Sequence, residues 1–506
     1  MRHPQAESGA AADSFSALDR INDAIDSIVN VPVGGVPLLV LWLAAAGVIL
    51  TAWMGFVNLR CFGHAIAIVR GRFDGAVPKG GADSRDPGEA RSAPRGGDVS
   101  HAQALWTALS GTLGLGNIAG VVIAIGIGGP GATFWMVLCG FFGMTLKFTE
   151  CALGQMYRVR DGDGRISGGP MHYLPTGLAE LGWPRLGRGL GATFAAVCVF
   201  SSFGAGNLFQ VTQATAVLRS AVPGLENHRW LLGALFAVVV GAVTIGGIRS
   251  VARVAGRLVP SMCLVYLVVV LAVLGIHVER IPGALVSIFE GALRPESAYG
   301  GFVGVLVAGM TRATFSNEAG TGSAAIAHAA AATDEPVRGG IVALLEPFLD
   351  TVVVCTLTAT MILVLDPGSS SDPAVASAMA SQEGATALLL LTGAELPWSK
   401  WVLVVAILSF ALSTVLTWSY YGERCVRHVM GDRGGAAAIA SYRVAFVGVV
   451  FAGALVEAEG ARRFADMAFL SLAFPNVLGL YFLAPKVKAA LVDYLRRMRR
   501  GPEGGA

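Results

Sequence analysis

The chain alternates between long apolar runs and short segments that are polar or rich in glycine. A helix needs about 20 consecutive apolar residues to cross a bilayer. Runs of roughly that length predict about eleven membrane-spanning helices, at residues 36–57, 103–128, 131–156, 190–218, 230–248, 257–276, 299–329, 339–365, 400–423, 437–456 and 464–484. We therefore expect an all-α polytopic membrane protein, because backbone in contact with lipid must satisfy its own hydrogen bonds.

The composition agrees with this pattern and excludes other classes. Hydrophobic residues make up 54% of the 506 and charged residues only 14%, whereas soluble proteins carry about 25% charged residues. None of the seven cysteines lies in a CxxC or Cys/His spacing, so we expect no disulfide framework and no transition-metal site. His101, His172 and His328 have no spacing typical of a metal site or a catalytic triad. We expect no enzymatic activity and no cofactor.

One predicted span carries a cluster of glycines that is unusual for a membrane helix. Residues 106–127 contain Gly111, Gly114, Gly116 and Gly120 within an apolar run. Each glycine inside a helix costs about 1 kcal/mol relative to alanine, so the cluster predicts a break. Broken backbone persists in a membrane only where protein, water or a bound solute satisfies it. The alternative is close packing of helices against the small residues.

A second interruption occurs five spans later. In residues 299–329, an apolar half meets the polar stretch 314–323, and a helix of small residues then resumes. Interrupted spans at corresponding positions of two repeats are typical of transporter binding sites. Helix N-termini favour a carboxylate, while carbonyls and helix C-termini favour an ammonium group or a cation. The pattern predicts a site for a zwitterion and a cation between two inverted repeats of five helices.

This repeat divides the chain into parts. We expect a tail with a surface amphipathic helix (1–34), an accessory membrane helix (35–58), a basic cytoplasmic loop (59–99), a first five-helix repeat (100–276), an external connector (277–298), a second five-helix repeat (299–485) and a basic cytoplasmic tail (486–506). Lysines and arginines concentrate in alternate loops and in the tail, and such loops lie in the cytoplasm. We expect a multi-pass protein of the plasma (inner) membrane with its N-terminus outside.

Several motifs resemble those of the alanine or glycine:cation symporter family, also called sodium:alanine symporters. They are GLGNIAG (114–120) with GGPGATFW (128–135), SGGPMHYL (167–174), TFSNEAGTGSAAIAHAA (314–330) and STVLTWSYYGERC (413–425). The resemblance implies a LeuT-type bundle of five plus five helices with one extra leading helix and two discontinuous helices. It also implies sodium-coupled import of alanine and glycine by alternating access. Leu115 departs from the family pattern, because a small polar residue is common there.

The resemblance also implies which residues form the site. The substrate carboxylate would meet the Leu115 and Gly116 amides and the Asn117 side chain, and Asn117 would alternatively cap the broken helix. The full substrate set that we predict is Thr112, Leu115, Gly116, Asn117, Gln210, Phe315, Ser316, Asn317 and Trp418. For Gln210, contact with the site and hydrogen bonding between helices are equally compatible with the sequence. The sodium ion would take Ser110 and Leu113 carbonyls and the side chains of Ser413 and Thr414.

Charged residues inside the spans are further functional candidates. Lys147 and Glu150 are three residues apart and are expected to pair, while Glu318 is expected to cap the half-helix after the second interruption. Asp350, with Glu346, would carry a proton or support the break. These carboxylates leave proton coupling open as an alternative to sodium coupling. A channel or an amino-acid sensor built on the same bundle is the alternative from another class.

Overall fold

The computed structural model describes residues 22–23, 31–33, 36–73, 99–160, 164–245, 247–293, 299–366 and 372–500. The amphipathic helix predicted at 15–29 lies almost entirely outside these residues. Two short antiparallel strand pairs are present, β1 (Pro32–Val33) with β2 (Val36–Pro37) and β3 (Val159–Arg160) with β4 (Ile166–Ser167). The rest of the described fold is helical, as the apolar runs predicted.

The helices follow the predicted spans closely. Their bounds are α2 (Leu38–Trp53), α3 (Val57–Arg60), α4 (Phe62–Val69), α5 (His101–Thr112), η2 (Leu115–Asn117), α6 (Ala119–Gly128), α7 (Ala132–Met156), α8 (Pro170–Glu180), α9 (Pro184–Phe203), η3 (Gly204–Leu208), α10 (Phe209–Ala221), η4 (Glu226–His228), α11 (Arg229–Thr244), α12 (Gly247–Ile276), η5 (Val278–Arg280), α13 (Ile281–Leu293), α14 (Tyr299–Asn317), α15 (Ser323–His328), α16 (Pro336–Ala343), α17 (Leu345–Pro347), η6 (Phe348–Cys355), α18 (Thr356–Leu365), α19 (Pro373–Ala380), α20 (Gly384–Glu395), α21 (Ser399–Gly453) and α22 (Ala458–Arg500). The segment predicted as an external connector therefore contains a helix of its own, α13.

Within the described residues, eight helices are long and apolar enough to cross a membrane, and α5 with η2–α6 makes a ninth if the bent pair is one span. Two predicted spans do not pass that test as they stand in the structure. The first, α2, has 16 residues, and the span predicted at 299–329 is divided into α14 and α15. The structure thus shows a multi-helix membrane protein, while the count of eleven and the five-plus-five repeat stay predictions.

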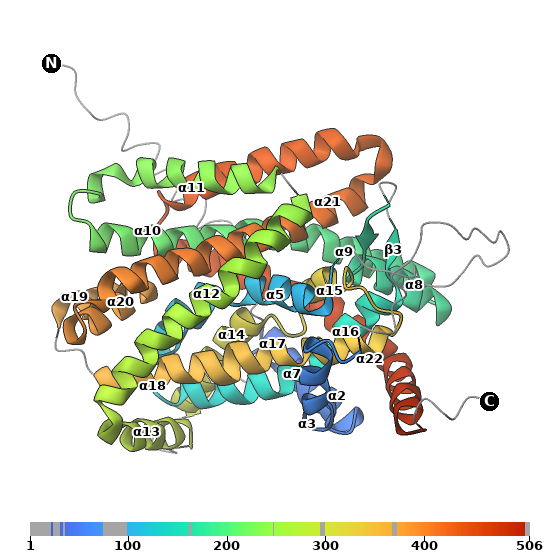
Figure 1. Cartoon of the computed structure of the whole chain (residues 1–506), viewed down its shortest axis with the longest axis horizontal. Helices are drawn as coiled ribbons and strands as arrows, with labels where there is room; N and C mark the ends of the chain where they lie inside the picture. Colours follow the sequence, from blue (N-terminus) through green and yellow to red (C-terminus); the bar gives the residue numbers. More distant parts are fainter. Residues whose placement is uncertain are drawn as a thin grey trace.

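The chain changes direction at two glycines, one between α6 and α7 and one inside α21. α6 ends at Gly128, and Gly129, with φ of 66°, turns the chain into α7. α21 contains non-helical backbone at Gly431, with φ of 63°, so two predicted spans follow one another through a sharp turn. In Figure 1 the second part of α21 runs beside α11. Glycine adopts these positive φ values without the steric cost that a Cβ imposes.

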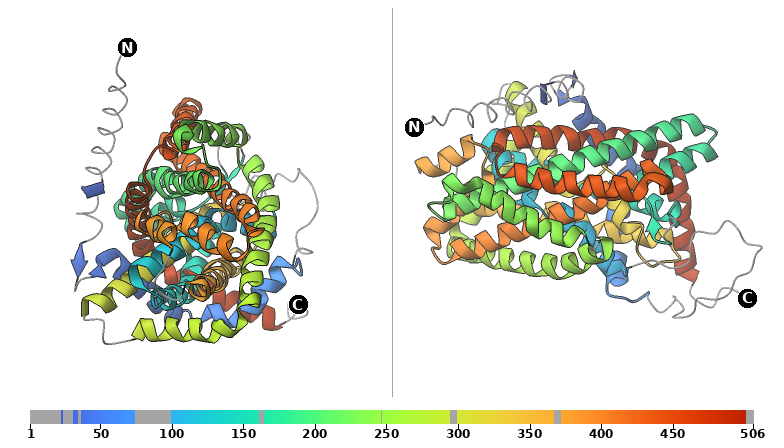
Figure 2. Two further views of the ribbon diagram at one scale, coloured as in Figure 1. Left: turned by 90° about the vertical axis from the view of Figure 1, so that its left-hand side faces the viewer. Right: turned by 90° about the horizontal axis from the view of Figure 1, so that it is seen from above.

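The two interrupted elements lie at the centre of the bundle and run antiparallel. α14 packs on α6, and α15 packs on α5, so the first part of each element contacts the second part of the other. α7, α21 and α22 pack around them, and α5 and α14 lie among the other helices near the middle of the molecule (Figures 1 and 2). This arrangement is the one expected of inverted repeats.

Two stretches of π-helix are present among the described residues, and one of them packs on the first break. η3 joins α9 to α10 and packs on α21 and α22, whereas η6 precedes α18 and packs on η2 and α14. A π-helix inserts an extra residue per turn and is found frequently at functional sites. Hydrophobic periodicity over so few residues does not reveal such a local change.

Candidate functional site

The first break is built by Leu113 and Gly114. The capping box of Ser100 and Gln103 starts α5, and the helix ends where Leu113 adopts φ of −73° and ψ of 65°. The chain then bends by 60° before α6. A Cβ on Gly114 would lie 2.5 Å from Thr414 Oγ1. The glycine cluster therefore marks a real break in the helix. Gly114 also allows α21 to approach the break closely.

The second break runs from Glu318 to Gly322. Glu318 has a φ of 56°, and Gly320 and Gly322 also have positive φ values. The Glu318 amide donates to the Thr314 carbonyl at 2.9 Å, and the Asn317 Oδ1 atom accepts from the Ala319 amide at 2.9 Å. Asn317 thus caps the turn that ends α14. The helix that resumes, α15, is only six residues long.

Gln210 reaches the first break from α10. Its Oε1 atom accepts a hydrogen bond from the Leu115 amide at 2.9 Å, and its Nε2 donates to the Ala205 carbonyl in η3 at 3.2 Å. The side chain is 2% exposed. Gln210 therefore forms hydrogen bonds between helices, and it does so at the amide that we predict to bind the substrate carboxylate; its contact with the substrate stays a prediction. Gly116 faces the end of α14, where a Cβ would lie 3.2 Å from the Phe315 ring.

Asn117 is fully buried and joins the first break to η6. Its Nδ2 donates to the Asp350 carbonyl at 3.2 Å, while its Oδ1 has no hydrogen-bond partner among the described residues. The Asp350 carboxylate accepts from the Ser316 hydroxyl and, at 2.9 Å, from Thr351. The structure does not bear out a helix-capping bond from Asn117. Asp350 therefore contacts one residue next to each break, Asn117 and Ser316, and both of its possible roles stay predictions.

Three of the predicted sodium ligands lie together between α5 and α21. The Thr414 hydroxyl donates to the Ser110 carbonyl at 3.1 Å, and the Ser110 hydroxyl donates to the Ser413 carbonyl at 3.0 Å. The Ser413 hydroxyl instead donates to the Phe410 carbonyl of its own helix at 2.9 Å. Thr417, which the sequence did not single out, donates to the Ser110 hydroxyl at 2.9 Å. Thr414 is therefore the predicted side-chain ligand that faces the break.

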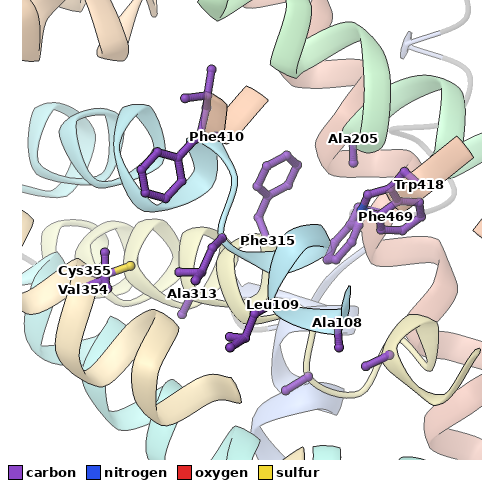
Figure 3. Close-up of a cluster of buried hydrophobic side chains, with 14 of the residues drawn as sticks. Ala108, Leu109, Ala205, Ala313, Phe315, Val354, Cys355, Phe410, Trp418 and Phe469 are labelled. Atoms are coloured by element: carbon purple, nitrogen blue, oxygen red, sulfur yellow. The ribbon is translucent and has the colours of Figure 1, made fainter. Parts of the chain in front are cut away.

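Aromatic rings line the space beside Phe315. The ring centroid of Phe469 lies 5.4 Å from that of Phe315 and 5.8 Å from that of Trp418, two of the predicted substrate residues (Figure 3). Phe209 contacts the other side of Phe315 at 5.0 Å. The guanidinium of Arg312 lies 5.2 Å from the Phe315 ring centroid and pairs with Asp466. No motif or spacing in the sequence marks Phe209 and Phe469, because lone phenylalanines are ordinary in membrane helices.

The expected pair of Lys147 with Glu150 is present, and Glu346 lies closer still to the same ammonium. Lys147 Nζ lies 3.3 Å from Glu346 Oε2 but 3.9 Å from Glu150 Oε1, and His328 also bonds Glu346. Glu150 Oε2 accepts from the Gly322 amide at 3.1 Å. The amide at the N-terminus of α15 therefore meets a carboxylate from α7, and the expected cap by Glu318 is not observed at that amide. Glu346 pairs with Lys147 and His328.

Comparison with known proteins gives a consistent set of matches. The sequence profile described as "Sodium:alanine symporter family" matches residues 18–505. A sodium/alanine symporter, AgcS, of Methanococcus maripaludis is 37% identical over 449 residues, which cover 88% of this chain and 92% of the relative. The probable sodium/glutamine symporter GlnT of Bacillus subtilis is 29% identical over 471 residues, covering 92% of this chain and 89% of the relative.

A solved structure is also similar. MhsT in complex with L-phenylalanine aligns with a TM-score of 0.52 at 15% identity, and the match covers 79% of this chain and 99% of that chain. At this identity the likeness concerns the fold alone. It confirms a LeuT-like arrangement of helices.

Proposed function

Because the chain belongs to the sodium:alanine symporter family, we propose that it imports alanine and glycine together with sodium by alternating access. The observation that carries this proposal is the pair of facing breaks at Gly114 and Glu318, which place non-helical backbone of both elements at the buried centre of the bundle. The N-terminus lies outside the cell membrane and the C-terminus inside.

The amino acid occupies the space between the two breaks. Its carboxylate replaces Gln210 Oε1 at the Leu115 amide and also meets the Gly116 amide and one N–H of Asn117 Nδ2, whose other N–H donates to the Asp350 carbonyl. Its ammonium meets carbonyls at Thr112 and in the stretch 315–317. Substrate binding therefore exchanges one acceptor for another at a donor that is already oriented.

The aromatic rings support a small side chain as the preferred one. Phe315 is 7% exposed and Trp418 is 1% exposed, so these walls leave little room without movement. An extra methylene in a filled pocket costs about 1–3 kcal/mol, which makes the preference graded. The names of the relatives include both alanine and glutamine, and the buried rings favour alanine here.

Sodium binds among Ser110, Leu113, Ser413 and Thr414 in this proposal. Thr414→Ala should raise the sodium concentration for half-maximal uptake by about tenfold or more, because the Thr414 hydroxyl already faces Ser110. Ser413→Ala should raise it less, since that hydroxyl bonds its own helix. Sodium activation of alanine uptake measures both effects. Equal effects of the two variants, or no effect of Thr414→Ala at normal protein level, would contradict this assignment.

Asn117→Ala should weaken alanine binding and also lower the thermal stability of the protein. The substitution removes the hydrogen bond to the Asp350 carbonyl, and a buried acceptor left unsatisfied costs about 1–3 kcal/mol. Alanine binding by calorimetry and unfolding temperature in detergent separate the two roles. Loss of stability with intact binding would reduce Asn117 to a structural residue.

Proton coupling is the second candidate, and the buried charges favour it specifically. Four carboxylates, those of Glu150, Glu318, Glu346 and Asp350, are buried, and Lys147 and His328 form ion pairs with two of them, Glu150 and Glu346. Burying carboxylates without compensation is unfavourable, so protons on some of them would lower the cost.

Labelled alanine uptake into proteoliposomes decides between the two couplings. One set of vesicles receives an inward sodium gradient and a matched set receives only an inward proton gradient. We expect uptake with sodium alone. Uptake with protons alone would move the coupling to the buried carboxylates, and no uptake under either gradient would reject the proposed substrate.

A further inference from the structure

Glu318 occupies the second break in a backbone conformation that is uncommon for its residue type. Its φ of 56° lies in the left-handed region, where Asn and Asp are enriched among non-glycine residues. Gly320 and Gly322, in the same break, adopt such values with no Cβ to clash. A residue held in this region persists only when its surroundings fix it. The side chain of Glu318 makes contacts of this kind.

The Glu318 carboxylate is buried and bonds two different elements. Its Oε1 accepts the indole N–H of Trp418 on α21 at 2.9 Å, and its Oε2 accepts the Ser323 hydroxyl at the start of α15. The residue is 2% exposed. Hydrogen bonds to an ionised acceptor are about twice as strong as neutral ones. The carboxylate thus ties the break to the ring of Trp418.

Capping of α15 does not account for this carboxylate. The amide of Gly322, which precedes α15, donates to Glu150 Oε2 at 3.1 Å. Asn476 donates to the same Glu150 oxygen at 3.0 Å and to the Gly320 carbonyl at 2.8 Å. The N-terminus of α15 therefore has its own partners on α7 and α22. The long-range hydrogen-bond partner of the Glu318 carboxylate is the indole of Trp418.

The ring of Trp418 is held on several sides and is linked to Phe315. A Cβ on Gly206 would lie 2.2 Å from the Trp418 Cβ, so the backbone of η3 presses directly on this residue. Phe469 lies beside the indole, and Figure 3 shows these two rings close together, with Phe315 to their left. Phe469 in turn contacts Phe315. A shift of the indole would therefore be passed through Phe469 to the wall of the substrate space.

We propose that Glu318 is a positioning residue that sets the size of the amino-acid pocket by fixing the indole of Trp418. This inference rests on the proposed function, in which Trp418 and Phe315 wall the side-chain pocket. Glu318 acts through Trp418 and does not touch the substrate. With the indole fixed, the pocket admits small neutral side chains and disfavours branched ones.

The test compares selectivity among variants in proteoliposomes. The measured quantity is the KM for leucine uptake divided by the KM for alanine uptake. Glu318→Ala should lower this ratio by about tenfold, the lower end of the effect of one methylene in an apolar pocket. Trp418→Phe, which lacks the N–H, should lower it similarly, and the double variant should lower it no further. Glu318→Gln keeps an acceptor for the indole and should restore the wild-type ratio.

Ser323→Ala is the matched control, because it removes the other hydrogen bond of Glu318 and spares the one to the indole. It should change the ratio by less than Glu318→Ala. If Glu318→Ala is not recovered as folded protein, Glu318→Asp takes its place, since the shorter side chain keeps the charge but withdraws from the indole. An unchanged ratio in the folded variant, or additive effects of Glu318 and Trp418 substitutions, would overturn the inference. Absence of alanine uptake by the wild-type protein would instead reject the proposed function, and this inference with it.

Discussion

Gly114→Ala is expected to reduce alanine uptake by about a hundredfold or more, on the scale known for displacements of about 1 Å at a reacting site. The added Cβ would lie 2.5 Å from Thr414 Oγ1 and 3.1 Å from Gln210 Oε1. Real Cβ atoms do not approach that closely, so α21 or the break must move. Both neighbours belong to the proposed substrate and sodium sites. Initial rates of sodium-driven uptake, corrected for protein level, measure the effect.

Gly120→Ala provides the matched control on the same interrupted element. Its Cβ would meet only Arg312 Cδ, at 3.9 Å, which is ordinary van der Waals contact. Gly120 also lies inside α6, where alanine favours the helix by about 1 kcal/mol. We expect uptake close to that of the wild-type protein. Similar losses in the two variants would mean that the whole element, rather than the contact at Gly114, is sensitive.

Lys147→Met is expected to destabilise the protein by about 3–5 kcal/mol, the range found when one partner of a buried ion pair is removed. Lys147 is fully buried and lies 3.3 Å from Glu346 and 3.9 Å from Glu150. Without the ammonium, both carboxylates lose a counter-charge in an environment that contains little water. Thermal unfolding in detergent measures the change, with the loss of monodisperse protein as the signal.

Two comparisons make this prediction specific. Lys486→Met removes an ion pair with Glu180 in which both side chains are substantially exposed, and exposed pairs contribute about 0–1 kcal/mol. Its unfolding temperature should stay near that of the wild-type protein. Adding Glu346→Gln to Lys147→Met should recover part of the lost stability, because one unpaired carboxylate is removed. No recovery, together with an equal loss in Lys486→Met, would exclude a charge-pairing role for Lys147.

The sequence by itself determined the class of the protein and the positions of its two breaks. Apolar runs of membrane length have few alternatives to a helix, because lipid offers no hydrogen-bond partner to the backbone. The glycines around Gly114 and the polar stretch 314–323 are unfavourable in a continuous membrane helix. They therefore indicate the two breaks even when the fold is unknown. The family motifs at 114–120, 314–330 and 413–425 also identified the relationship that the profile match confirms.

Only the tertiary structure decided which side chains meet at those breaks. Gln210 and Leu115 are 95 residues apart, and Ser110 and Thr414 are 304 apart. Such contacts depend on how each helix is rotated and shifted along its axis, and an apolar run that is buried on most sides does not specify that rotation. The sequence therefore paired Lys147 with its near neighbour Glu150, while packing brought Glu346 closer.

The same reason explains the residues that the sequence did not reveal. Phe469 contacts Phe315 because the long helix α22 passes beside α14. The Ser413 hydroxyl donates to the Phe410 carbonyl of its own helix. The π-helical segment η3 adds an extra residue to its turn and places Gly206 against Trp418. Composition and spacing set where the chain crosses the membrane and where it breaks. Close packing between distant helices set the shape and the chemistry of the space between the breaks.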